Sequence, residues 1–473
     1  MLSEHISSQI YDYFGFVPTM GQKKVIKRLA EYLTDLDFTK IFILNGYAGT
    51  GKTTLIAALV RTLKAMRIKP VVLAPTGRAA KVAASYMGER AFTIHKKIYR
   101  QRTATSHEAH FSLDANREKD AVFIVDEASM LSNHASSGND IFGSGLLLDD
   151  LVHYVRSGAR CRLMLVGDDA QLPPVGFDRS PALDAKFMEI YGPVEYASLD
   201  EVVRQDSESG ILFNATMVRC MLEVGIYEPP LFDLSRPDVR AIGGGEFLEL
   251  VESCYSLYGR DEVMVITRSN KRANRFNEGI RRHVLYADGE IESGDMLMIV
   301  KNNYHYTERL EESRMDFMAN GDIARLVRLR RCEELYGFRF AEARLAFPDY
   351  DDMEIDCKIL LDTLSSEAPS LSSEQSKALF YAVAEDYAEI KSKEKRYREV
   401  RENPYYNAVQ VKFANAVTAH RAQGGQWKAV FVDRMLFGDE PMTRDWMRWL
   451  YTVLTRATER LYLVNFDERF VGN

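Results

Sequence analysis

A run of glycine, threonine and lysine residues between two apolar stretches has the residue types that bind phosphate. It reads Gly46-Tyr47-Ala48-Gly49-Thr50-Gly51-Lys52-Thr53-Thr54. Apolar residues 41–44 precede it and residues 55–60, which favour a helix, follow it, so we expect a strand, a glycine loop and a helix. Successive N–H groups of such a loop point at one anion, and the helix N-terminus adds partial positive charge. The sequence therefore predicts a nucleoside triphosphate site rather than a glycine-rich turn that binds nothing.

The side chains of this loop have separate predicted roles. Lys52 would reach the β- and γ-phosphates, and the Thr53 hydroxyl would hold Mg²⁺. Upstream, Gln22 stands just before the periodic stretch 25–29. Its amide can donate and accept at once, which suits the edge of an adenine. The alternative for Gln22 is a solvated residue at a helix start.

Two later apolar runs end in polar residues that would complete such a site. Residues 121–125 run directly into Asp126 and Glu127. Asp126 would hold Mg²⁺, and Glu127 would orient and deprotonate an attacking water. Residues 162–166 lead to Gln171, which would sense the γ-phosphate. The prolines after Gln171 either transmit that signal or are structural punctuation.

Further candidates follow strand ends, where α/β sheets place ligand contacts. The apolar run 70–74 ends in Pro75-Thr76-Gly77-Arg78, and a polar, basic segment at 93–97 opens a helix. A solvated turn is the alternative for the second segment. Residues 100–118 are polar and irregular, with Phe111 isolated among polar neighbours, and predict a loop or a small hairpin.

Composition sets broad limits. A chain of 473 residues exceeds one core, so we expect two to four domains. The net charge of −7 argues against a generally basic surface but not against a local basic groove. Five cysteines without a CxxC pair argue against a disulfide framework or a zinc site. With no signal peptide and no segment of transmembrane length, the predicted location is the cytoplasm, with no membrane partner.

Four of these segments, taken in order, resemble the motifs of superfamily 1 helicases. They are Gly-Tyr-Ala-Gly-Thr-Gly-Lys-Thr, Ala-Pro-Thr-Gly-Arg-Ala-Ala, Val-Asp-Glu-Ala-Ser-Met and Gly-Asp-Asp-Ala-Gln-Leu-Pro-Pro-Val-Gly. The resemblance is closest to the branch that contains RecD and phage Dda. It implies further motifs downstream.

Sequences similar to these further motifs are present. Arg204-Gln205 lies in a segment similar to the family's fourth motif, whose arginine touches the γ-phosphate. Residues 417–427 resemble the Thr-x-His-x-x-Gln-Gly motif. Residues 451–457 resemble the Tyr-x-x-x-Thr-Arg-Ala motif, which carries an arginine finger. Arg456 would therefore direct a fixed guanidinium at a phosphate that develops charge.

The chemistry and the resemblance together give four groups of predicted site residues. The catalytic group is Lys52, Asp126, Glu127, Gln171, Arg204 and Arg456. The nucleotide-binding group is Gln22, Gly46, Gly49, Thr50, Gly51, Lys52, Thr53, Thr54, Gln171, Arg204, Gly425 and Arg456, and the metal ligands are Thr53 and Asp126. The DNA-binding group is Pro75, Thr76, Gly77, Arg78, Thr93, His95, Lys96, Phe111, Pro174, Val175, Thr418 and His420.

The expected fold class is α/β, with two RecA-like parallel-sheet motor domains in tandem, a small β hairpin insert and an SH3-like β insert that carries a helical extension. Strands of the second sheet are expected at 262–267, 429–432 and 460–464. The expected division is motor domain 1 at 1–195 with a candidate pin hairpin at 100–118, motor domain 2 at 196–289 and 411–473, and the SH3-like insert at 290–410 with its helical extension at about 372–403. Tyrosines of that extension either stack on bases or pack, and packing is the more common use of such residues.

The resemblance implies an ATP-dependent DNA helicase or translocase that moves 5′ to 3′ along single-stranded DNA and unwinds duplex. Its cofactors would be ATP and Mg²⁺. Its substrates would be single-stranded DNA and tailed duplex DNA, and it would act as a monomer with protein partners in repair or recombination. The alternative is a nucleic-acid-stimulated ATPase, or an RNA-directed remodelling motor, that does not unwind. A plain P-loop switch or kinase would leave residues 417–427 and Arg456 unexplained.

Overall fold

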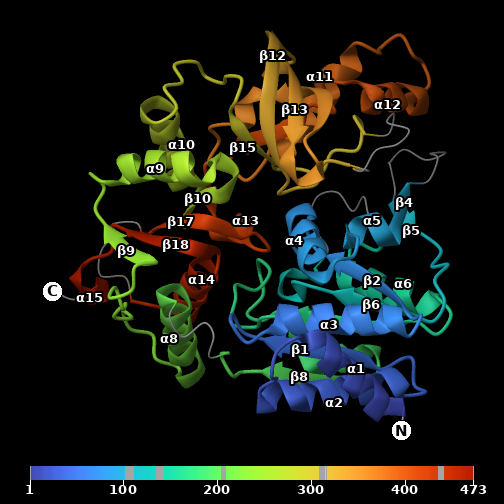
Figure 1. The fold of residues 1–473 in the computed structure, drawn as a ribbon. Helices are drawn as coiled ribbons and strands as arrows, with labels where there is room; N and C mark the ends of the chain where they lie inside the picture. The colour runs from blue at the N-terminus through green and yellow to red at the C-terminus, as the bar shows by residue number, and fades with distance from the viewer. Residues whose placement is uncertain are drawn as a thin grey trace.

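Two parallel sheets and a closed barrel make up the computed structural model (Figure 1). It describes residues 2–101, 111–134, 143–203, 209–307, 315, 317–434 and 441–471, and of Gln101 and Phe111 the backbone alone. Within this part of the chain, no helix is both long enough and apolar enough to cross a membrane. The α/β fold class expected from the sequence is confirmed.

The first sheet has six strands in the order β3-β2-β6-β7-β1-β8. They are β1 Ile41–Gly46, β2 Lys69–Ala74, β3 Ala91–Thr93, β6 Ala121–Val125, β7 Arg162–Gly167 and β8 Val194–Leu199. Its helices are α1 Leu2–Phe14, α2 Met20–Thr34, α3 Lys52–Ala65, α4 Gly77–Met87, α5 Ile94–Ile98, α6 Leu147–Ser157 and α7 Ala185–Met188. The expected boundary after residue 195 falls inside β8, which pairs with β1, so this unit extends at least to Leu199.

Both faces of the first sheet are covered, which is why its strands are continuous apolar runs. Phe42 and Leu44 pack with α1, α2 and α3 on one face. Ile41 and Ile43 pack with α5 and α6 on the other. This alternation fixes the register of β1 and therefore the direction in which the loop after it leaves the sheet.

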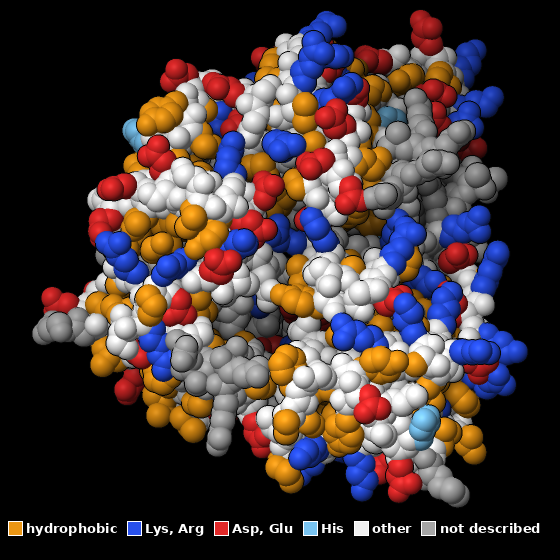
Figure 2. Space-filling view, in the orientation of Figure 1, with side chains coloured by type: hydrophobic (Ala, Val, Ile, Leu, Met, Phe, Trp, Pro, Cys, Tyr) orange, Lys and Arg blue, Asp and Glu red, His pale blue; other side chains and the backbone are white. Residues whose placement is uncertain are grey.

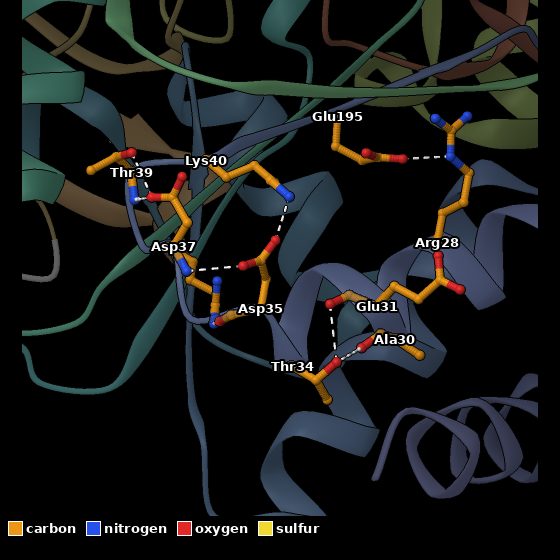
Figure 3. A network of polar contacts seen from close by, with 10 residues as sticks. Arg28, Ala30, Glu31, Thr34, Asp35, Asp37, Thr39, Lys40 and Glu195 are labelled. Carbon is orange, nitrogen blue, oxygen red and sulfur yellow. Dashed lines mark hydrogen bonds and ion pairs between the residues drawn. The ribbon is translucent and has the colours of Figure 1, made fainter. Parts of the chain in front are cut away.

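A polar turn connects α2 to β1 (Figure 3). The Asp37 carboxylate accepts from Thr39 N at 2.8 Å and from its hydroxyl at 2.6 Å, while Asp35 pairs with Lys40. Arg28 of α2 pairs with Glu195 of β8 at 2.5 Å. These contacts hold α2 against the edge strand β8 and fix where the chain enters β1.

The second sheet has five strands in the order β16-β10-β17-β18-β9, all paired in parallel. They are β9 Val239–Ile242, β10 Val263–Thr267, β16 Ala416–Thr418, β17 Trp427–Asp433 and β18 Ala457–Val464. Its helices are α8 Gly210–Val224, α9 Phe247–Tyr258, α10 Asn270–His283, α13 Ala419–Ala422, α14 Arg444–Leu454 and α15 Glu468–Val471. The three predicted strands are present, and β9 and β16 flank them.

The chain between β10 and β16 forms a closed barrel with a helical extension. The barrel strands are β11 Met296–Ile299, β12 Ile323–Leu335, β13 Phe338–Phe347, β14 Met353–Leu360 and β15 Val409–Phe413. The expected limit of this insert at residue 410 falls inside β15. The extension is two helices, α11 Ser373–Glu385 and α12 Lys393–Glu402, rather than one stretch.

The tyrosines of the extension mainly pack. Phe380 contacts the rings of Tyr397 and Tyr406, with centroids 5.0 and 5.5 Å apart, and Tyr387 and Tyr405 pack on the same cluster. Tyr381 is 60% exposed. The packing interpretation therefore holds for the other four.

A two-stranded hairpin, β4 Tyr99–Gln101 with β5 Phe111–Leu113, lies where the small β insert was expected. The backbone of Phe111 pairs with Gln101. The assignment of Phe111 to DNA lies outside the described side chains.

Candidate nucleotide and nucleic-acid site

The predicted phosphate loop connects β1 to the first residue of α3, Lys52. Gly49 and Gly51 have φ of 73° and 76°, a region that favours glycine. A Cβ on Gly51 would lie 2.6 Å from the Gln22 amide nitrogen. The loop therefore requires glycine for its backbone conformation and for its close packing.

Polar side chains of the loop and of the start of α3 donate hydrogen bonds to the carbonyl groups of the loop. Thr50 is 1% exposed, and its hydroxyl donates to Tyr47 O at 2.8 Å. Lys52 Nζ donates to Gly46 O at 2.9 Å, inside the loop. Thr53 and Thr54 are half-buried in the first turn of α3. The structure thus brings the predicted phosphate ligands together.

Gln22 lies beside the loop and already has two backbone partners. Its Nε2 donates to Thr50 O at 2.9 Å, and its Oε1 accepts from Thr19 N at 2.9 Å in a capping box at the start of α2. The side chain is 2% exposed. Gln22 therefore positions the loop, and an adenine contact remains a prediction.

The predicted acidic pair follows β6 directly, at the carboxyl edge of the sheet. Asp126 N donates to Leu73 O at 2.9 Å, and the Asp126 carboxylate accepts from Glu127 N at 2.9 Å. Burial and the Glu127 charge raise the pKa of Asp126, against the nearby Lys52 ammonium. Glu127 has φ of 52°, and its Oε2 is buried without a hydrogen-bond partner among the described residues. A strained backbone and an unpaired carboxylate oxygen are typical of a functional position.

The loop after β7 carries Asp168 and Gln171. Asp168 is 1% exposed, and burial raises the pKa of its carboxyl group. Gln171 is 5% exposed, and its Oε1 is buried without a partner in the described part of the chain. An unpaired amide oxygen here fits the predicted sensing role, which no contact in the structure tests.

Side chains of the second motor domain reach the phosphate loop. Tyr451 Oη accepts from Ala48 N at 2.9 Å and donates to Asp168 Oδ2 at 2.7 Å. The Arg219 guanidinium lies 4.3 Å from the centroid of the Tyr47 ring. Residues of the loops after β1 and β7 share one apolar cluster with residues of the second sheet and of the barrel. The phosphate loop therefore lies at the junction of the two sheet domains.

The predicted arginine finger is held within its own domain. Arg456 is 3% exposed and donates to Thr452 O, Gly425 O and the Thr455 hydroxyl at 3.0, 3.3 and 3.2 Å. Its described hydrogen-bond partners lie outside the phosphate loop. Arg204 lies outside the described residues, so its predicted role has no structural counterpart here.

Predicted DNA-binding residues of the first domain contact the second. Thr76 caps α4 by accepting from Ala79 N at 3.2 Å. The Arg78 guanidinium lies 4.4 Å from the Trp427 ring centroid and donates to Gln426 O at 3.0 Å, while its Nε has no partner among the described atoms. A Cβ on Gly424 would lie 2.8 Å from Ala79 Cβ. The two segments expected to hold a strand thus face each other across the domain junction.

The barrel lies against the same end of α4. Lys81 Nζ donates to Pro348 O at 3.0 Å and pairs with Asp349 at 3.1 Å. A Cβ on Gly77 would collide with Asp322 and with the Tyr350 hydroxyl. Gly77 therefore permits the barrel to approach α4 closely.

The remaining predicted DNA-binding residues lie on several separate elements. Thr93 caps α5, and burial lowers the pKa of His95 to about 4. Lys96 lies in α5, and Pro75 is half-buried ahead of α4. Figure 2 shows lysine and arginine side chains gathered over α5 and the β4–β5 hairpin. Pro174 is half-buried, Val175 is 79% exposed, Thr418 is half-buried and His420 is exposed.

The donor set fits ATP and one Mg²⁺. Asp126 and the Thr53 hydroxyl are oxygen ligands of the kind that Mg²⁺ takes together with phosphate oxygens and water. The described residues contain no group of three or more His, Cys, Asp or Glu that could hold a metal. A metal completed by nucleotide phosphates does not need such a group.

Sequence reasoning gave no role to Tyr451 and did not consider Arg219. Tyr451 opens the motif that carries Arg456, and only the arginine of that motif has a predicted role. Arg219 lies in α8, in none of the quoted motifs. Which residues meet the loop from the second domain depends on how the two sheets are placed, and no local pattern carries that information.

Comparison with known proteins agrees with this arrangement. A family model described as an AAA domain matches residues 19–217, which hold all six strands of the first sheet. A model described as a UvrD-like helicase C-terminal domain matches residues 413–464, which hold β16, β17 and β18.

Individual relatives are more distant. The chain is 26% identical over 308 residues to the ATP-dependent RecD2 DNA helicase of Deinococcus radiodurans, covering 61% of this chain and 38% of that protein. It is 21% identical over 514 residues to protein R530 of Acanthamoeba polyphaga mimivirus, covering 93% and 98%. A crystal structure of a Bacteroides Pif1 helicase with ADP-AlF3 and ssDNA aligns at 14% identity and a TM-score of 0.48, covering 97% of this chain and 95% of that chain.

The chain thus spans 38% of the length of the Deinococcus protein. The two family models follow each other in the order that the motifs predict, one on each sheet. These matches agree with the resemblance to RecD-like superfamily 1 helicases that the motifs indicate.

Proposed function

We propose that this protein is an ATP-dependent DNA helicase that moves 5′ to 3′ along single-stranded DNA and unwinds tailed duplex. The observation that carries the proposal is the position of the phosphate loop. Its residues Tyr47 and Ala48 contact Arg219 and Tyr451 of the second motor domain. A nucleotide bound there would lie between two domains that can close on it and release it.

In this proposal Lys52 and Thr53 bind the phosphates and the metal, and Glu127 orients the attacking water. Mg²⁺ neutralises charge on the phosphates when it is bound. Arg456 and Arg204 are the candidates for stabilising the transition state from the second domain. Arg456 uses three of its five N–H donors within the second domain, so two remain for a phosphate.

The strand is proposed to lie along the facing segments of α4 and the loop around Gly424, next to the barrel. Arg78 and Thr76 contribute from the first domain, and Thr418 and His420 from the second. Contacts of this kind go to phosphates and to base faces, so binding should be tolerant of sequence and sensitive to salt. The accompanying domain division is a first motor domain ending after Leu199, a second motor domain in two pieces, and the barrel with its helices as an insert.

The decisive experiment is ATP-dependent strand displacement on duplexes with a single-stranded tail at the 5′ or the 3′ end. Displacement from the 5′ tail alone is expected, and Lys52→Ala should abolish it together with ATP hydrolysis. Displacement from the 3′ tail alone would keep a helicase and reject the polarity. ATPase stimulation by single strands without displacement would favour a translocase, and stronger stimulation by RNA than by DNA would favour the RNA-directed alternative.

A further inference from the structure

One tyrosine hydroxyl joins the second motor domain to two parts of the nucleotide site. Tyr451, on α14, is 1% exposed. Its hydroxyl accepts from Ala48 N at 2.9 Å and donates to Asp168 Oδ2 at 2.7 Å. Both bonds cross the domain junction. Because one hydroxyl carries a single donor, the bond to Asp168 uses its full donating capacity.

The same face of α14 continues along the loop after β7. Thr452 Oγ1 accepts from Leu172 N at 2.9 Å, and Arg448 donates to Asp169 O at 3.5 Å. Residues 448, 451 and 452 are three and four positions apart, so they share one side of the helix. The helix is therefore fitted to this loop, and Tyr451 extends the contact to the phosphate loop.

Just beyond the C-terminal end of α14, the chain contacts the loop that faces the predicted DNA-binding segment. Arg456, just beyond the helix, donates to Gly425 O at 3.3 Å, and Gly424 packs against Ala79 of α4. Tyr451 lies in the last turn of α14, and Arg456 follows that turn by two residues. The C-terminal turn of α14 and Arg456, which also donates to Thr452 O of that turn, thus connect the phosphate loop to the contact between Gly424 and α4.

We propose that Tyr451 is a positioning residue that couples nucleotide binding in the phosphate loop to the grip of the two domains on a nucleic acid strand. This inference rests on the proposed function and adds the residue through which its two sites communicate. In the structure Ala48 N–H bonds to a neutral hydroxyl. A nucleotide in the loop would offer Ala48 N–H a charged phosphate oxygen, which forms a stronger hydrogen bond than a neutral hydroxyl does.

When Ala48 N–H donates to a phosphate oxygen instead of the Tyr451 hydroxyl, the bond between α14 and the loop is lost. Because α14 is packed on both sides, it moves as a unit, and the Gly424 region moves with it against α4. The coupling is reciprocal, so strand binding also changes nucleotide affinity by the same factor.

The test measures the dissociation constant of a fluorescent single strand with and without a non-hydrolysable ATP analogue. In wild-type protein the analogue is expected to change this constant by about tenfold, within the usual range of coupling. Tyr451→Phe keeps the ring and removes the hydroxyl. It is expected to reduce the factor to about one while each ligand still binds, and to lower ssDNA-stimulated ATPase more than basal ATPase.

Tyr32→Phe is the matched control. Tyr32 is 2% exposed, and its hydroxyl donates to Leu163 O at 2.8 Å inside the first domain. Tyr32→Phe removes an equally buried tyrosine hydroxyl. The analogue should still change the dissociation constant of the strand by the wild-type factor, even where this variant has a lower melting temperature. Asp168→Asn should lose coupling as Tyr451→Phe does, and the double variant should lose no more than either.

Wild-type coupling in both Tyr451→Phe and Asp168→Asn would overturn the inference. A wild-type protein that hydrolyses ATP and binds the strand, but with an affinity indifferent to the analogue, would overturn it too and leave the proposed function standing. A wild-type protein that binds neither ligand would overturn the proposed function and this inference with it.

Discussion

Gly424→Ala is the substitution that most directly probes the closed arrangement of the two motor domains. Gly424 has φ of 72°, and an added Cβ would lie 2.8 Å from Ala79 Cβ on α4. The left-handed backbone costs a non-glycine residue about 1–2 kcal/mol. Optimal carbon contacts lie at roughly 3.5–4.0 Å, so the domains have to separate by about 1 Å or strain their packing.

These two costs act on different properties. The backbone term weakens the second domain whether the domains are open or closed, so it lowers the melting temperature. The collision penalises the closed state alone, by about 1–3 kcal/mol as for other overpacked contacts. That penalty lowers the closed population, and we expect ssDNA-stimulated ATPase to fall by roughly 5- to 150-fold.

A second substitution separates the two terms. Ala79→Gly removes the methyl group that the new Cβ meets, so Gly424→Ala/Ala79→Gly should recover most of the stimulated ATPase without recovering the melting temperature. Ala79→Gly alone, an interior helix change worth about 1 kcal/mol, is the control for α4. Wild-type activity in Gly424→Ala would refute the reasoning, since turnover would not pass through this closed contact. A double variant as slow as Gly424→Ala would assign the whole effect to backbone strain.

Two further predictions concern stability. Arg281 and Asp295 form a buried ion pair at 2.9 Å, with side chains 8% and 3% exposed, so Arg281→Met should lower the free energy of unfolding by about 3–5 kcal/mol in denaturant. Arg344→Met, which breaks an exposed pair, should lower it by less than about 1 kcal/mol. Equal losses of unfolding free energy in the two variants would contradict this prediction. Burial raises the pKa of Asp322 to about 7, so the folded protein binds this proton more tightly than the unfolded chain does, and the contribution of Asp322 to stability falls as pH rises from about 4 to 7. Asp322→Asn should therefore gain melting temperature relative to wild type across this range, and parallel pH profiles would contradict the assignment.

The strands that carry the nucleotide site were predictable because each is a short apolar run followed directly by residues that can bind phosphate or a metal. β1 leads to the glycine loop and β6 leads to Asp126. A strand buried on both faces has no alternative to a continuous apolar run, so its sequence is unambiguous. The resemblance to known helicase motifs then placed the second sheet.

Edges and inserts were less predictable. β9 is four residues long with Arg240 exposed, so its local pattern is weak. The helical extension was expected as one stretch, and residues 386–392 carry no proline or glycine that would mark the break between its two helices. The chain turns there because Ser392 caps α12 and Arg396 donates to Ala388 O at 3.2 Å, contacts that a periodic pattern does not reveal.

The residues of the candidate site also fall into a predictable and an unpredictable group. Residues within one loop or one strand end came together as expected, because their spacing along the chain fixes their spacing in space. Tyr451 and Ala48 are 403 positions apart, and their bond depends on how two separate sheets are placed. Arg456 shows the converse, since its motif predicts a partner across the junction while its bonds in this structure are local.

The insertion of the barrel between β10 and β16 also sets an order of assembly. Val263 of β10 pairs with Ala429 of β17, so the second sheet needs residues that are synthesised only after the whole barrel. At about 5–20 residues per second, β10 waits on the order of ten seconds for its partner on the ribosome. The barrel strands are contiguous in the chain and can pair during that time. The second motor domain is therefore the last part of the molecule to form, and the unpaired apolar strand β10 is where premature association with another chain has to be prevented.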